Sequence, residues 1–162
     1  MLKLKEITLY KETGGIMSGD PSLIASPYLI KNISYDDVYK LSSLGSKIIQ
    51  KEAIKIAKEN NIKILVNSLY LNENGSIVSF KSDVRTYLGV SNDDKYIYLV
   101  GKVKEEDSKV IISLMNEYNI LVKKIKVKKD YILIEVIAGK RNFALNLIHH
   151  KFMHKRVKEY DF

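Results

Sequence analysis

The chain has 162 residues, of which 46% are hydrophobic and 28% are charged, and it contains no cysteine. This composition is typical of a folded protein with one ordinary domain or two small ones. The missing thiols exclude disulfides, thiolate zinc sites and a cysteine nucleophile. No apolar run approaches the ~20 residues of a membrane span, and residues 1–10 (MLKLKEITLY) alternate where a signal peptide would be continuously apolar. We therefore expect a cytoplasmic protein with no membrane partner.

Most of the positive charge lies in the second half of the chain. The formal net charge is +8, and residues 95–162 carry +7 of it. A basic half can attract nucleic acid or acidic surfaces. However, only Arg85, Arg141 and Arg156 are arginines, and arginine is the side chain best suited to read bases and to bind phosphate with two hydrogen bonds. A solvated lysine-rich surface is therefore favoured, and a nucleic-acid partner is the less favoured alternative.

Local patterns predict the first elements of the chain. Alternation of polar and apolar residues predicts a strand over residues 2–9. The segment Ser18-Gly19-Asp20-Pro21 predicts a turn, because Gly and Pro occupy special backbone angles. Ser34, with Asp37 three residues later, is typical of a helix N-cap. The helix that follows is interrupted at Gly45.

A second helix is predicted over about residues 51–60, where apolar residues recur on one side of the helix. A half-buried strand at residues 62–66 follows almost without a loop, as is common in α/β units. A short strand is predicted at residues 76–80. Residues 81–94 are mainly polar, and we interpret them as a linker.

The linker divides the chain into a first part (residues 1–80) and a second part (residues 95–162). In the second part, apolar runs and periodic segments alternate in the order β-α-β-β-α-β. The strands are expected at residues 96–103, 120–127, 131–137 and 157–162, and the helices at residues 105–118 and 143–152. This order is that of a split βαβ sandwich, in which the helices cover one face of the sheet.

Four segments of the first part resemble the aspartokinases, in the family's order. They are Gly15-Ile16-Met17-Ser18-Gly19-Asp20-Pro21 (family D-G-(I/V)-x-T-A-D-P), residues 33–49 (I-S-Y-x-E-A…L…G-A-K-V-L), residues 62–68 (I-P-I-x-V-x-N-(T/S)) and Gly75-Ser76-Ile77 (G-T-x-I). The resemblance implies that residues 1–80 are the C-terminal portion of an amino acid kinase domain. It also implies a vestigial nucleotide-binding set at Lys11, Glu12, Asp20 and Lys47. Lys11-Glu12 replaces the usual Thr-Asp of the family, and a solvated helix-end lysine is the alternative for Lys47.

The second part resembles the ACT module that follows the kinase domain in this family. The segment from Ala144 to Phe152 is similar to A-v-x-x-L-H-x-x-F. The implied fold class is α/β, a partial amino-acid-kinase-type sheet segment followed by a βαββαβ, ferredoxin-like ACT domain. The resemblance implies a homodimer and an amino-acid effector of the lysine or threonine class, bound through Gly101, Lys102, Val103, Lys104, Asn119 and Ile120. Three acids follow this loop at residues 105–107, so docking is an alternative to sensing.

The family's Lys-Phe-Gly-Gly-Thr-Ser stretch, which carries the phosphate-binding lysine and glycines, has no match in this sequence. Phosphoryl transfer needs amides and cations around the transferred phosphate. We therefore predict no catalytic residue and no cofactor for this chain alone, with ATP and Mg²⁺ entering only if a partner chain completes the site. We then expect a non-catalytic regulatory protein that dimerises and either binds an amino-acid effector or docks on a full-length aspartokinase. The alternative is one component of a split aspartokinase that a complementary chain activates.

Two further clusters allow two interpretations each. His150 and His154 are four residues apart and could form half of a metal site, but ordinary helix histidines are favoured and no metal is predicted. Lysines from residue 123 to residue 129 alternate with apolar residues and could form a nucleic-acid stripe. A solvated or dimer-rim strand is favoured for them.

Overall fold

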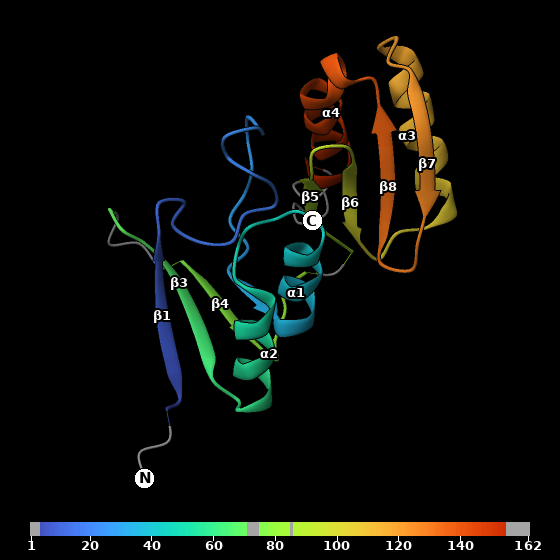
Figure 1. Ribbon diagram of the computed structural model, residues 1–162. Helices are drawn as coiled ribbons and strands as arrows, with labels where there is room; N and C mark the ends of the chain where they lie inside the picture. The colour runs from blue at the N-terminus through green and yellow to red at the C-terminus, as the bar shows by residue number, and fades with distance from the viewer. Residues whose placement is uncertain (1–3, 71–74, 85, 155–162) are drawn as a thin grey trace, which may run out of the picture.

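The computed structural model describes residues 4–70, 75–84 and 86–154, which form two four-stranded sheets with helices beside them (Figure 1). The first sheet has the strand order β1-β3-β4-β2, and the second has the order β5-β6-β8-β7. The first part of the chain contains β1 (Glu6–Lys11), β2 (Asn32–Ser34), α1 (Tyr35–Ser43), α2 (Lys51–Glu59), β3 (Lys63–Ser68) and β4 (Ser76–Ser79). The predicted elements of this part are confirmed in type, with shifted ends.

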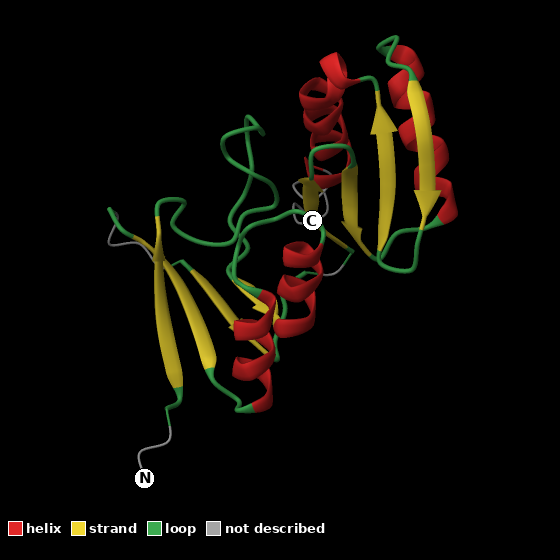
Figure 2. Cartoon of the chain, viewed as in Figure 1, coloured by secondary structure: helices red, strands yellow, loops and turns green. Residues whose placement is uncertain are grey.

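The first sheet is mixed, and α1 and α2 lie beside one of its faces (Figure 2). Strand β1 pairs with β3 in parallel, β4 runs antiparallel to β3, and β2 is parallel to β4. Alternate residues of the strands point to the helices, so Ile33, Ile64, Val66 and Val78 are fully buried. The opposite face leaves Tyr10 62% exposed.

The predicted helix ends are confirmed in their chemistry. The Ser34 side chain accepts a hydrogen bond from the Asp37 amide at 3.1 Å, which satisfies one of the free amides at the start of α1. Helix α2 is followed by Asn61 in the left-handed conformation (φ 52°). Asparagine tolerates this conformation better than most residues, so the chain can turn directly into β3.

The second sheet is antiparallel, and two helices cover one face of it (Figure 1). The apolar side chains on that face, among them Ile97, Leu99, Ile132 and Ile134, are fully buried. The elements are β5 (Tyr87–Asn92), β6 (Ile97–Gly101), α3 (Glu105–Glu117), β7 (Val122–Val127), β8 (Tyr131–Val136), the short helix η1 (Ala138–Lys140) and α4 (Arg141–Met153). The last strand expected at residues 157–162 lies outside the described residues.

The interpretation of residues 81–94 as a linker needs correction, because residues 87–92 form strand β5 at the edge of the second sheet. The segment contains polar residues, yet Ser91 is only 4% exposed and donates its hydroxyl hydrogen to the Leu44 carbonyl at 2.7 Å. Helices α4 and α1 both contact β5, and its residues 88–91 are buried. A strand buried on both faces shows no alternation, so the period-two rule did not reveal it.

The two parts of the chain meet along β5. The Val90 amide donates to the Ser18 carbonyl at 2.8 Å, and Ile24 from the long loop between β1 and β2 belongs to the core of the second part. Figure 1 shows this loop rising from the first sheet toward α4. Within the described residues, no helix has the length and apolar character needed to cross a membrane.

Candidate functional site

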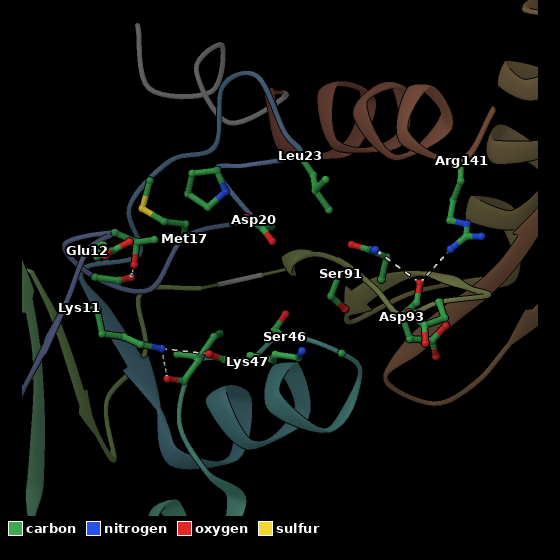
Figure 3. Close-up of a pocket in the computed structure, with 18 of the residues that line it drawn as sticks. Lys11, Glu12, Met17, Asp20, Leu23, Ser46, Lys47, Ser91, Asp93 and Arg141 are labelled. Atoms are coloured by element: carbon green, nitrogen blue, oxygen red, sulfur yellow. Dashed lines mark hydrogen bonds between the residues drawn. The ribbon is translucent and has the colours of Figure 1, made fainter. Parts of the chain in front are cut away.

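A cleft of about 850 Å³ lies where the two parts meet (Figure 3). Its walls are the end of β1, the turn that contains Asp20, the loop after α1 that contains Lys47, the β5–β6 hairpin and the start of α4. A cleft of this volume is in the range of small-molecule sites. We therefore take it as the candidate functional site.

The structure brings together all four residues of the predicted nucleotide-binding set. Lys11, Glu12, Asp20 and Lys47 all line the cleft, although they come from three separate segments of the chain. The parallel pairing of β1 with β3 and the connection of β3 to α2 place the end of β1 beside the loop after α1. The four residues therefore lie around one cleft.

Lys11 secures one wall of the cleft. Its ammonium donates hydrogen bonds to the carbonyl of Lys47, at 3.0 Å, and to the carbonyl of Ile48. Burial lowers the pKa of Lys11, because a charged ammonium loses hydration when it is covered. Lys11 thus anchors the loop after α1 and adds a positive charge at its base.

Lys47 and Asp20 differ in how they are held. The Lys47 side chain is exposed and makes no ion pair with the described residues. One carboxylate oxygen of Asp20 accepts hydrogen bonds from the Ser22 amide (2.8 Å) and the Ser22 hydroxyl (2.7 Å). Asp20 therefore shapes its own turn, while Lys47 offers a charge to a ligand.

Two residues of the cleft, Asp93 and Arg141, were missed from the sequence. Asp93 accepts hydrogen bonds from the amides of Lys95 (2.8 Å) and Tyr96 (2.7 Å) and from the Tyr98 hydroxyl (2.5 Å). Burial acts to raise the pKa of Asp93, but these hydrogen bonds and the charge of Arg141 lower it below its ordinary value. The spacing of Asp93 from Lys95 and Tyr96 is that of an Asx-turn, a signal that was available.

Arg141 enters the cleft from the start of α4 (Figure 3). Its guanidinium donates to the Asp93 carbonyl at 3.2 Å. No local pattern marks it, because it reaches the cleft only through packing of the two parts. The cleft is thus lined by three cations (Lys11, Lys47, Arg141) and four acids (Glu12, Asp20, Asp93, Asp94), so it suits a ligand with both anionic groups and hydrogen-bond donors.

Comparison with known proteins agrees with this geometry. Residues 1–68 match the model of the amino acid kinase family. The chain is therefore similar to the aspartokinases, and its residues 1–68 are similar to the amino acid kinase family. The aspartokinase of Geobacillus stearothermophilus is 28% identical over 97 residues, which is 58% of this chain and 24% of that protein. The chain therefore spans about a quarter of the length of this curated relative.

Solved aspartokinase structures share the fold. The crystal structure of Clostridium acetobutylicum aspartate kinase superposes with a TM-score of 0.76 at 12% identity, over 91% of this chain and 55% of that one. Escherichia coli aspartokinase III in complex with aspartate and ADP gives a TM-score of 0.53 at 14% identity, over 82% of this chain and 31% of that one. At these identities the likeness shows the fold alone.

The aspartokinase resemblance also predicted an effector loop, and in the structure its amides are already used. Three of these amides donate to backbone carbonyl oxygens. The Gly101 amide donates to the Asp130 carbonyl (2.9 Å), the Lys102 amide to the Thr86 carbonyl (2.7 Å) and the Val103 amide to the Gly101 carbonyl (2.9 Å). The Lys104 amide donates to the buried carboxylate of Asp107 at 2.7 Å. None of these four amides is available to a ligand carboxylate in this conformation.

The other two effector candidates lie away from this loop. Asn119 (φ 52°) and Ile120 follow the C-terminal end of α3, whereas residues 101–104 precede its start. Helix α3 has 13 residues, so roughly 20 Å of helix separates the two groups. Within one chain the structure does not bring the six candidates together.

The histidines of α4 and the lysines of β7 lie outside the cleft. His149 is 2% exposed and bonded to Ser18, and the rings of His150 and His154 lie 4.8 Å apart. Among the described residues, no group of three or more His, Cys, Asp and Glu could hold a metal. The lysines of β7 lie on an edge strand, and Lys124 lies over the Tyr96 ring at 5.6 Å.

Proposed function

We propose that this chain is an aspartokinase-like regulatory protein that binds a nucleotide in its cleft and does not phosphorylate aspartate by itself. The observation that carries the proposal is the convergence of Lys11, Glu12, Asp20 and Lys47 on one cleft. The family resemblance points to these four positions, and three separate segments of the chain supply them.

The chemistry of the cleft fits a nucleotide. The exposed ammonium of Lys47 can pair with a phosphate group, since an ion pair that also forms hydrogen bonds is stronger than a neutral contact. The carboxylates of Glu12 and Asp20 are hydrogen-bond acceptors of the kind that holds ribose hydroxyls in other nucleotide sites. Aspartokinase III of Escherichia coli has been solved with ADP and aspartate bound, which supports the same ligand class.

The proposal that this chain does not phosphorylate aspartate by itself is based on the residues that the given sequence lacks. It has no counterpart of the Lys-Phe-Gly-Gly-Thr-Ser stretch, and the described cleft brings no glycine-rich run of amides to a phosphate. Transfer of a phosphoryl group needs such donors, together with Mg²⁺ and a positioned nucleophile. ATP and Mg²⁺ would act as cofactors only where a partner chain completes the site.

Calorimetric titration of the purified chain with Mg-ADP tests the proposal. We expect binding, and we expect Lys47→Ala to weaken it about tenfold, because one charge-assisted contact contributes on the order of 1.4 kcal/mol. Lys51→Ala is the matched control, since Lys51 is exposed at the start of α2 and outside the cleft. The proposal would be contradicted if the titration gave no heat of binding. It would also be contradicted if this chain alone phosphorylated aspartate robustly.

A second candidate function is that of one component of a split aspartokinase. Two observations on the first sheet favour it. Strand β1 lies at the edge of the sheet, and on the face away from the helices Tyr10 and Ile77 are 62% and 38% exposed. An exposed edge can pair with a strand of another chain. Mixing this chain with a chain that carries the phosphate-binding half should then produce ATP-dependent aspartyl phosphate. If the two chains form a stable complex that makes no aspartyl phosphate, this candidate function is ruled out.

Dimerisation and effector binding belong to the same proposal. We expect a cytoplasmic homodimer formed through the second part, and the engaged amides of residues 101–104 favour docking on another kinase chain over sensing of free lysine or threonine. Light scattering after size-exclusion chromatography measures the dimer. A thermal shift with lysine or threonine would restore the sensor interpretation, because a ligand of the folded state raises the melting temperature.

A further inference from the structure

The turn that carries Asp20 is held by helix α4 of the second part. The side-chain oxygen of Asn146 accepts the Ala25 amide hydrogen at 3.0 Å. Its side-chain nitrogen donates to the Leu23 carbonyl at 2.7 Å and to the Asn142 carbonyl at 2.9 Å. One amide group thus binds the loop from both sides, and Asn146 itself does not line the cleft.

Apolar packing fixes the same turn. Ile24 is 3% exposed and lies in the core of the second part. Gly19, next to Asp20, sits so close to Ile24 that a Cβ atom there would come within 2.2 Å of its side chain. The turn that carries Asp20 is therefore held against the second part through Leu23, Ile24 and Ala25.

The opposite wall of the cleft depends on the second part as well. The hydroxyl of Ser91, in β5, donates to the Leu44 carbonyl at 2.7 Å, at the end of α1. Gly45 has φ +96°, and a Cβ atom on it would lie 2.2 Å from the Asn92 carbonyl oxygen. The loop that presents Lys47 is therefore pressed against β5.

We propose that Asn146 and Ser91 are positioning residues that hold the two walls of the cleft, so that the second part sets the cleft's affinity for its ligand. This inference rests on the proposed function, in which the ligand is a nucleotide. The physical reason is preorganisation. A loop that is already ordered loses less conformational entropy when a ligand binds than a loop that must be ordered by the ligand.

Three variants in the full chain test the inference. Asn146→Ala removes both hydrogen bonds to the turn, and Ser91→Ala removes the bond to Leu44. Asn142→Ala is the control, since its exposed side chain lies one helical turn away on α4. Amide hydrogen exchange and calorimetric titration with Mg-ADP are measured for each variant.

For Asn146→Ala we expect exchange over residues 18–28 to rise about tenfold while α3 and β7 keep the wild-type rate, because only the local opening is affected. We expect the dissociation constant for ADP to rise about tenfold as well. Ser91→Ala should raise amide exchange over residues 44–48 and the dissociation constant for ADP by similar factors. Asn146→Asp keeps the acceptor for Ala25 but not the donor for Leu23, so it should be intermediate. Asn142→Ala should match the wild type.

Three results would overturn the inference. One is wild-type exchange and affinity in Asn146→Ala and Ser91→Ala. Another is faster exchange throughout the chain, which would assign these residues a role in overall stability alone. The third is locally faster exchange with unchanged ADP affinity. If the wild type binds no ADP, the proposed function fails instead, and the confined change in exchange then decides by itself whether Asn146 and Ser91 position the two walls.

Discussion

Ser18 and His149 form a buried hydrogen bond between the two parts of the chain. The Ser18 hydroxyl oxygen lies 2.8 Å from Nε2 of His149, and the two residues are 1% and 2% exposed. The same oxygen accepts the Tyr28 amide hydrogen at 3.0 Å. Burial favours the neutral imidazole, and the tautomer of His149 sets which of the two groups donates in the Ser18–His149 bond.

The burial of His149 predicts that stability depends on pH. Burial, then the charges of His154 and His150, lower the pKa of His149 from 6.5 to about 4. Between these values the unfolded chain binds a proton that the folded chain does not, so stability is complete above pH 6.5 and falls as the pH drops toward 4. We expect a loss of about 3 kcal/mol over this range.

Urea unfolding at pH 7.5, 6, 5 and 4.5 measures the dependence. Replacing His149 by Gln removes the titrating group, so the variant should lose most of the slope even if it is less stable at neutral pH. Lys151→Gln is the control, because Lys151 is exposed on the same helix and is not among the groups that lower the pKa of His149. A wild-type stability that stays flat from pH 6.5 to 4.5 would refute the assignment.

Ser18→Ala is expected to destabilise the chain by about 1–3 kcal/mol, because it leaves the buried Tyr28 amide and His149 Nε2 without the Ser18 oxygen and hydroxyl. Chemical denaturation at pH 7.5 gives the free energy of unfolding. Ser26→Ala is the control, as Ser26 is exposed in the same loop. Equal stability of the two variants would show that the Ser18–His149 bond contributes nothing measurable.

Two glycines provide a matched pair. Gly45→Ala should cost about 2 kcal/mol or more, because φ is +96° and the new Cβ would meet the Asn92 carbonyl oxygen at 2.2 Å. Gly139→Ala has nothing within 4 Å of the new Cβ and should be neutral or slightly stabilising. Thermal unfolding of both variants checks the difference, and a stable Gly45→Ala would contradict the close contact with β5.

Asp107 is expected to contribute more to the stability of the fold than its acidic neighbours. Its carboxylate accepts hydrogen bonds from the Lys104 amide at 2.7 Å and from the Tyr87 hydroxyl at 2.8 Å. Asp107→Ala should therefore cost about 1–2 kcal/mol. Glu106→Ala, an exposed change in the same turn, should cost much less, and guanidinium unfolding distinguishes the two.

The same substitution has a spectroscopic consequence. Burial raises the pKa of Tyr87, and the hydrogen bond and charge of Asp107 raise it further. Asp107→Ala should lower the pKa of Tyr87, which ultraviolet difference titration of the phenolate detects against the Tyr87→Phe background. An unchanged phenolate titration would mean that Asp107 and Tyr87 are not paired in solution.

Local pattern predicted those elements that are determined by their own residues. Ser34 caps α1 through its side chain, and the apolar stripe of α2 is a property of nine consecutive residues. Strand β2 has three residues, Asn32–Ser34, and exists because β4 supplies its pairing partner. A segment this short has no periodicity, so no local rule could have predicted it.

The same division applies to the cleft. The sequence by itself determined the other helices and strands, but not β2 and β5. It also determined the N-cap of α1 and, through the family resemblance, the choice of Lys11, Glu12, Asp20 and Lys47. Only the tertiary structure decided that these residues share one cleft and that Arg141 and Asp93 complete it. The physical reason is range. Caps and periodicity act within a few residues, whereas β5 and the walls of the cleft depend on packing between the two parts, which no short segment encodes alone.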